Sequence, residues 1–193
     1  MKKRVNYDYY YQSPDLFGAA YPELVAFYEG FPLRGTLLDV GCGQGRDALV
    51  LAGMGFEVVG IDHSSVGIEQ MLAAAKAAKL NLKGTVLDIY QYQAFGQYDF
   101  ILLDSMFHFA KKEQLKEKEF LLRIMRRMRS EAIISVCIGN TGRKVETLLS
   151  ILDGEKAFQI IQNEDFDYQF VDKENSHSSI TPYKMLSLKK VGV

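Results

Sequence analysis

The sequence predicts an α/β fold in which helices cover a mostly parallel sheet. Short apolar runs alternate along the chain with segments of helical periodicity, and this order of elements is typical of parallel strands joined by crossover helices. A glycine-rich turn follows the first apolar run, and acidic residues end the next ones. With 193 residues, 48% of them hydrophobic and 24% charged, the chain is long enough to bury a substantial core, and we expect one domain, residues 1–193.

The individual elements follow from apolar patterning and from the residues that start and stop helices. Residues 1–20 are tyrosine-rich and are expected to be irregular. Pro22 and Gly30 stand where a helix over 21–29 would begin and end. Further helices are expected after the glycine-rich turn, to about residue 54, and over 65–79, 111–129 and 143–152. Five strands are expected over 36–40, 57–61, 82–87, 98–103 and 132–138. The tail, 158–191, is predicted to be a β-hairpin around 172–179.

The most informative segment is the turn after the first predicted strand, where Gly41, Gly43 and Gly45 alternate with other residues. Glycine allows a sharp turn and lets a ligand approach the main chain, because no Cβ stands in the way. The helix that follows offers free N–H groups and a partial positive charge to an anionic group. This turn could hold a carboxylate as readily as a phosphate.

Two strand-end acids add to this pattern. Asp62 closes the second strand 19 residues after Gly43, and a carboxylate there can accept hydrogen bonds from both ribose hydroxyls. Asp88 closes the third strand, where it can accept from an adenine amino group while the Ile89 N–H donates to a ring nitrogen. Each acid could instead be a solvated strand end, and Asp62 could cap the next helix. Ligands of open α/β sheets bind at this edge.

These segments resemble the motifs of class I S-adenosylmethionine-dependent methyltransferases. The similar segments are the glycine-rich turn with its strand, the two strand-end acids and the end of the fourth strand: 38–45, 60–64, 87–89 and 100–104. The resemblance covers about residues 36–139. Residues 43–49 and 55–58 are especially similar to the branch that contains tellurite-resistance and thiopurine methyltransferases.

The resemblance implies a Rossmann-like sheet of seven strands, with the last strand antiparallel and inserted between the fifth and sixth. It implies S-adenosylmethionine as cofactor, with the glycines along its methionine part, Asp39 below them, Asp62 at the ribose, and Asp88 and Ile89 at the adenine. Asp104 would face the methionine end or the substrate. The full set of expected cofactor residues is Asp39, Gly41, Cys42, Gly43, Gly45, Asp62, His63, Asp88, Ile89 and Asp104. Residues 36–139 would form the cofactor-binding core, 1–35 a cap or lid, and 140–193 the substrate side with the hairpin.

Other ligand classes fit less well. A nicotinamide-dependent oxidoreductase needs a small residue where Arg46 stands, and a P-loop nucleotidase needs Lys-Ser or Lys-Thr after the glycines. A base methyltransferase of this family usually has an Asn-Pro-Pro-Tyr type motif after the fourth strand, and the chain has no proline there. The arginines of 123–129 share their helix with glutamates, so we interpret them as a solvated face. A catalytically silent cofactor-binding regulatory or partner subunit remains the alternative to an enzyme.

On the substrate side, His108 and Asp104 are the candidate catalytic residues, since histidine titrates near neutral pH. His108 could equally be structural. The further substrate-side candidates are Tyr11, Phe17, Asn140 and His177. The tyrosine-rich start could be a lid that excludes water, or an arm packed elsewhere or at a homodimer contact.

The chain has no large inserted recognition segment, so a small-molecule substrate is expected. Net charge is −1 and only two cysteines occur, without metal-type spacing. We therefore expect a reduced, cytoplasmic protein that binds no metal, nucleic acid or membrane.

Overall fold

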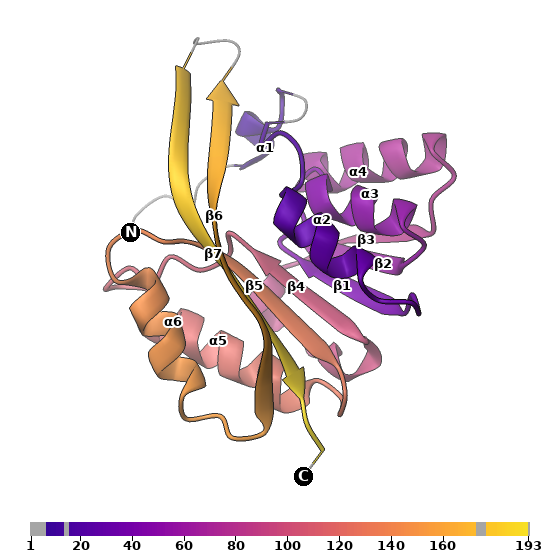
Figure 1. Cartoon of the computed structure of the whole chain (residues 1–193). Helices are drawn as coiled ribbons and strands as arrows, with labels where there is room; N and C mark the ends of the chain where they lie inside the picture. Colours follow the sequence, from indigo (N-terminus) through magenta and orange to yellow (C-terminus); the bar gives the residue numbers. More distant parts are fainter. Residues whose placement is uncertain (1–6, 14–15, 173–176, 193) are drawn as a thin grey trace.

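A computed structural model describes residues 7–13, 16–172 and 177–192, with the backbone alone at 171, 172 and 177. Seven strands form one sheet in the order β3-β2-β1-β4-β5-β7-β6. Neighbours from β3 to β5 pair in parallel, whereas β7 pairs antiparallel with both β5 and β6 (Figure 1). The strands are β1 (Thr36–Val40), β2 (Glu57–Asp62), β3 (Leu82–Val86), β4 (Phe100–Asp104), β5 (Ile133–Gly139), β6 (Phe158–Asp172) and β7 (His177–Lys190).

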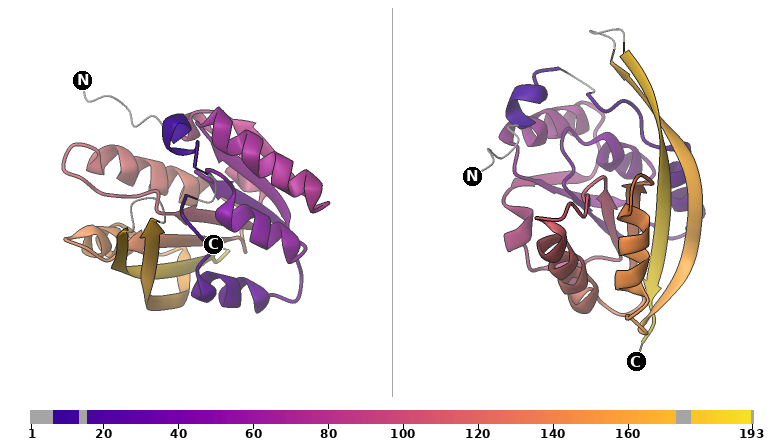
Figure 2. Two further views of the ribbon diagram at one scale, coloured as in Figure 1. Left: turned by 90° about the horizontal axis from the view of Figure 1, so that it is seen from above. Right: turned by 90° about the vertical axis from the view of Figure 1, so that its left-hand side faces the viewer.

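Helices cover both faces of the sheet (Figures 1 and 2). They are α1 (Tyr7–Tyr10), α2 (Pro22–Glu29), α3 (Arg46–Gly53), α4 (Ser65–Ala77), α5 (Gln114–Arg127) and α6 (Lys144–Leu152), with short 3₁₀ turns η1 (Ile89–Gln91) and η2 (Phe95–Gln97). One buried cluster joins the sheet to α5 and α6, and the other joins it to α2, α3 and α4. The central strands are therefore apolar on both faces: β4 buries its first four residues and β5 buries all seven.

The β6–β7 hairpin is longer than the sheet it joins. Residues 183–189 of β7 pair with β5, whereas 177–182 pair only with β6. The part of the hairpin that does not pair with β5 projects beyond the carboxyl ends of β4 and β5, on the same side as α1 (Figure 1). Its inward side carries Phe166 and Tyr168, which pack against Tyr21 at the start of α2. The hairpin thereby forms one wall above the sheet edge at which the glycine-rich turn lies.

The predicted fold class is confirmed, including the antiparallel last strand between the fifth and sixth. The strands and helices expected from the sequence are present within a few residues of their predicted ends. The N-terminal segment differs, because residues 7–10 form a helical turn rather than irregular chain. That turn is held from outside: Asp8 accepts a hydrogen bond from the Ser64 hydroxyl at 2.5 Å. Tertiary contacts that local sequence does not encode therefore fix it.

Within the described residues, none of the helices has the length and apolar character that a membrane crossing needs.

The core on the α5 side yields a stability prediction. Phe120 is 2% exposed and lies in van der Waals range of the rings of Tyr90, Phe95 and Phe107. We expect Phe120→Ala to lower the free energy of unfolding by about 3–5 kcal/mol, because it removes apolar contacts and leaves a cavity. Leu115→Ala on the same helix, where Leu115 is 68% exposed, should change it by less than about 0.5 kcal/mol. Urea denaturation of both variants tests this, and equal effects would contradict the assigned packing.

Candidate functional site

The glycine-rich turn bends back over the end of β2. Gly41, Gly43 and Gly45 all have positive φ, at 78°, 52° and 85°, which side chains with a Cβ adopt rarely. The Gly41 N–H donates to the Ile61 carbonyl at 2.7 Å, and the Gly45 N–H donates to the Cys42 carbonyl at 2.8 Å. Gly45 then precedes α3, whose first residue is Arg46. The turn thus presents main-chain surface at the carboxyl edge of the sheet.

Asp62 holds this turn from the neighbouring strand. One carboxylate oxygen accepts the Gly43 N–H at 3.0 Å and the other accepts the Ser64 N–H at 2.8 Å. The side chain is buried, and the His63 ring nitrogen lies 3.3 Å from it. Asp88 follows the end of β3, accepts the Tyr90 N–H at 3.1 Å and is half-buried next to the buried Ile89. The acids after β2 and β3 therefore lie at one edge of the sheet, beside the turn.

The N-terminal segment covers the turn. The Tyr11 side chain is buried, and its hydroxyl occupies the space that a Cβ on Gly43 would need. Gln44 fastens the segment by donating to the Ser13 carbonyl at 2.9 Å and by accepting the Leu16 N–H at 3.0 Å. Met106 lies similarly against Gly41. Access to the turn therefore requires that Tyr11 and Met106 move.

A largely buried cation, with 15% of its side chain exposed, lies beside the turn. The Arg46 guanidinium pairs with Asp47 at 3.0 Å and with Asp104 at the end of β4. It also stacks over the Tyr21 ring, 4.4 Å from its centroid, and faces Tyr168 of β6 at 6.0 Å. Burial lowers the pKa of Arg46, but Asp47 and Tyr21 raise it by more, so the charge is retained. Arg46 thus connects the turn, the fourth strand and the hairpin.

Asp39 lies under the turn at 3% exposure. Burial raises the pKa of its carboxyl well above the usual value, and the neighbouring Asp47 raises it further. The Ala48 N–H and Arg46 act in the opposite direction, but they do not offset burial. A carboxyl in this position is available to a cationic group placed over the glycines.

The segment after β4 is held by the buried Glu117 of α5. The same carboxylate oxygen of Glu117 accepts the N–H groups of His108, at 3.1 Å, and Phe109, at 2.5 Å. Phe107 and Phe109 are buried, whereas His108 between them is exposed. The structure therefore places the predicted base on the surface, without a described contact between its ring and Asp104.

The other substrate-side candidates are spread around the edge. Phe17 is exposed and its carbonyl accepts the Tyr168 hydroxyl at 2.9 Å. Asn140 follows β5 and is exposed, and its N–H donates a hydrogen bond to the Pro182 carbonyl at 2.6 Å. His177 is the first residue of β7; its side chain and residues 173–176 lie outside the described part. Of the three candidates whose side chains are described, the structure brings only Tyr11 against the turn.

Sequence reasoning missed the residues around the buried cation. From the sequence, Arg46 was used only to argue against a dinucleotide-binding turn. Tyr21, Ser105, Tyr168 and Tyr183 were not assigned to the site. The adjacent pair Arg46-Asp47 at the start of a buried helix was the available signal, because two charges there need partners inside the fold.

The turn and its acids suit S-adenosylmethionine in donor and acceptor chemistry. The positive-φ glycines carry no Cβ that would separate a ligand from the main chain, once Tyr11 and Met106 have moved. Buried Asp39 matches an amino group, and Asp62 and Asp88 offer oxygens to hydroxyl and amino donors. The hydroxyl of Tyr11 is the group that such a ligand would displace or contact at Gly43.

The turn geometry gives a second prediction. Gly45 has a φ of 85°, and a Cβ there would clash with the Met71 side chain. We expect Gly45→Ala to lower the free energy of unfolding by about 2 kcal/mol or more, from backbone strain and overpacking together. Gly53→Ala, at the other end of the same helix with open space around it, should be neutral or stabilising. Thermal unfolding compares them, and a stable Gly45→Ala protein would argue against this turn conformation.

A third prediction concerns pH. Because the Asp39 pKa is higher in the folded than in the unfolded chain, the folded state holds the proton more tightly. The free energy of unfolding therefore falls as pH rises from about 3.9, the unfolded value, through the folded pKa. Asp39→Asn removes this loss and should be more stable than the unmodified protein at neutral pH, by on the order of 1 kcal/mol.

The stability gap between Asp39→Asn and the unmodified protein should shrink as pH falls toward about 4. Denaturant titration across this range measures it, and a gap that does not vary with pH would contradict the raised pKa.

Three comparisons with known proteins agree with this geometry. A family model described as tellurite resistance protein TehB matches residues 21–134, more than half of the chain. The ribosomal RNA small subunit methyltransferase J of Coxiella burnetii is 35% identical over 124 residues, which cover 58% of this chain and 48% of the relative. The probable S-adenosyl-L-methionine-dependent methyltransferase TehB of Haemophilus influenzae is 33% identical over 79 residues, which cover 41% of this chain and 28% of the relative.

The chain thus spans less than half of the length of these curated relatives. The solved structure of TehB from Haemophilus influenzae has a TM-score of 0.72 and 17% identity, covering 95% of this chain and 66% of that one, which establishes a shared fold. Fold, turn and family match lead to one conclusion: the chain belongs to the TehB family of class I S-adenosylmethionine-dependent methyltransferases.

Proposed function

We propose that this protein transfers the methyl group of S-adenosylmethionine to a small-molecule acceptor. The observation that carries the proposal is the position of Asp62 against the glycine-rich turn. Its carboxylate accepts hydrogen bonds from the N–H groups of Gly43, in the turn, and of Ser64. This contact fixes a ribose-binding carboxylate next to the surface that would hold the methionine part. The family match supports the cofactor and the class of reaction.

Each cofactor residue has a proposed task. The glycines and Asp39 would hold the methionine part, Asp62 the ribose, and Asp88 with the Ile89 N–H the adenine. Cys42 and His63 lie next to these groups in the chain. The bound cofactor supplies an electrophilic methyl group, and the protein has to position the nucleophile and exclude water. Residues 7–13 and 16–17, fastened through Gln44, would act as the lid that excludes water.

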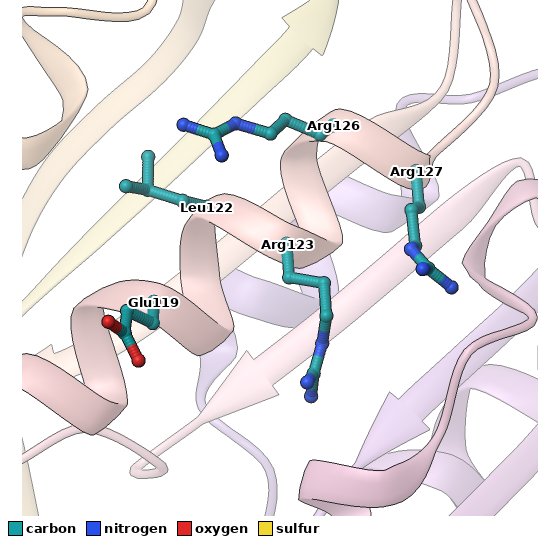
Figure 3. A pocket seen from close by; sticks show the side chains of 5 residues that line it. All are labelled: Glu119, Leu122, Arg123, Arg126 and Arg127. Carbon is teal, nitrogen blue, oxygen red and sulfur yellow. The ribbon is translucent and has the colours of Figure 1, made fainter.

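A small acceptor is favoured over RNA by where the arginines lie. Arg123, Arg126 and Arg127 line a shallow hollow of about 380 Å³ on α5. Figure 3 shows their side chains pointing in different directions rather than toward one point. Arg123 donates to the Tyr90 carbonyl at 2.6 Å. The last turn of α5, which carries Arg126 and Arg127, precedes β5 and so lies at the opposite edge of the sheet from the glycine-rich turn.

The fourth prediction tests the cofactor site. Asp62→Ala removes a charged acceptor whose hydrogen bonds are worth about 1.5–3 kcal/mol each, so we expect S-adenosylhomocysteine to bind roughly ten- to hundred-fold more weakly by calorimetry. Asp153→Ala, which removes an exposed carboxylate at the end of α6, is the control and should bind normally. Equal affinity of both variants would remove Asp62 from the site.

Activity separates an enzyme from a silent binding subunit. Methyl transfer from labelled S-adenosylmethionine is measured across a panel of thiols, amines, phenols and oxyanions. Tight binding of S-adenosylhomocysteine together with no transfer to any acceptor would favour the silent subunit, and binding of NAD in its place would favour an oxidoreductase.

A further inference from the structure

A chain of hydroxyls ends at Asp104, beside the proposed methyl-transfer site. The Ser105 hydroxyl donates to one carboxylate oxygen of Asp104 at 3.1 Å. The Tyr183 hydroxyl of β7 lies 3.1 Å from the Ser105 oxygen. The other oxygen of Asp104 pairs with Arg46, the residue that follows the last glycine of the turn. The chain therefore runs from the hairpin wall to the carboxyl end of β4.

The direction of these hydrogen bonds follows from proton counting. An ionised carboxylate paired with a guanidinium can only accept. Ser105 has one hydroxyl proton, and Asp104 receives it. Tyr183 must therefore donate to Ser105, which leaves the lone pairs of the Tyr183 oxygen as acceptors. The free end of the chain is a hydrogen-bond acceptor that can bind only a group carrying a proton.

The backbone holds this arrangement against a conformational preference. Ser105 has a φ of 54°, in the left-handed region that residues other than glycine rarely adopt. Its N–H donates to the Cys137 carbonyl of β5 at 2.9 Å. Such strain is concentrated at functional sites. Here it places the serine hydroxyl between a carboxylate and a tyrosine from a different strand.

Arg46, the cation next to the chain, is matched by Asp47 and Asp104, so it has no unpaired charge to offer to an anionic acceptor. Asp39 lies under the same turn, close enough to Arg46 and Asp47 for their charges to act on its carboxyl. A neutral nucleophile that carries a proton fits the acceptor end of the chain.

On the basis of the proposed function, we infer that the Tyr183–Ser105–Asp104 chain binds the methyl acceptor and removes its proton, and that the acceptor is a neutral amine, thiol or hydroxyl compound that carries a proton on its nucleophilic atom. The nucleophile X–H bonds to the methyl group while the carbon–sulfur bond breaks and its electron pair stays on sulfur. The proton of X–H passes to the Tyr183 oxygen, the tyrosine proton to Ser105, and the serine proton to Asp104, from which it reaches solvent at the exposed Ser105. Because X–H becomes acidic as the new bond forms, a carboxylate is a sufficient base.

The test uses two pairs of probe acceptors that differ in whether they carry a proton at about pH 8. Phenol and benzyl mercaptan are mostly protonated there, whereas 4-nitrophenol and thiophenol are mostly ionised. Tyr183→Phe and Ser105→Gly break the chain, and glycine tolerates the left-handed backbone. Tyr28→Phe is the matched control, since it removes a tyrosine hydroxyl that also bonds a serine, Ser135 at 3.1 Å, inside the core.

We expect the unmodified protein to methylate at least one protonated probe, and Tyr183→Phe and Ser105→Gly to lower kcat/KM for it by about 100-fold. Transfer to its ionised partner should change by less than about threefold, and Tyr28→Phe should leave both unchanged. Equal losses for both members of a pair, or transfer by the unmodified protein to ionised probes only or to none, would overturn the inference.

Calorimetry with S-adenosylhomocysteine is run on all of these proteins. We expect Tyr183→Phe and Ser105→Gly to bind it as the unmodified protein does, and a loss of binding in both variants would mean that the chain serves the cofactor site instead. If the unmodified protein does not bind it, the proposed function fails, and this inference fails with it for a different reason than lost proton transfer.

Discussion

The architecture of the site depends on one largely buried guanidinium. Arg46 pairs with Asp47 and Asp104 and stacks on Tyr21, so a single side chain links the glycine-rich turn to β4, to α2 and, through Tyr168, to the hairpin. A charge buried in this way is held only if its partners stay in place, because each of them would otherwise be left unpaired at a cost of several kcal/mol. The turn, the end of β4 and the hairpin wall must therefore form together.

The same edge of the sheet has to open and to close. Tyr11 lies against Gly43, and its segment is fastened by contacts to Gln44 and by the Asp8–Ser64 hydrogen bond. These are single, partly buried polar contacts, each worth about 1 kcal/mol, and Tyr11 adds a buried ring, whereas the sheet beneath is buried on both faces. If the segment acts as the proposed lid, its displacement would break these contacts and leave the strand ladder intact.

Much of the fold could be predicted because its signals are local. The strands are apolar runs bounded by turns, and the paired β6 and β7 follow from a polar stretch between two β-rich segments. The proximity of the turn glycines to Asp62 could be predicted, because their spacing along the chain reflects a geometry that the backbone imposes. The Arg46 cluster was not predicted, because it joins residues from 21 to 183 whose proximity exists only after folding. His108 was predicted as a base from its chemistry, but burial of Phe107 and Phe109 on either side turns it outward.

The fold places four aspartates around the turn in different electrostatic environments. Asp62 accepts two backbone N–H groups, and Asp104 is paired with Arg46. Asp39 is buried with little compensation, and its pKa is raised. Asp47 has a raised pKa from burial, although Arg46 opposes the shift. A single cation cannot satisfy all of them, so their mutual repulsion and burial oppose folding. A ligand that carries positive charges, as an amino group and a sulfonium do, would offset part of that cost on binding. The acids therefore favour a cationic cofactor through the same charges that lower the stability of the fold.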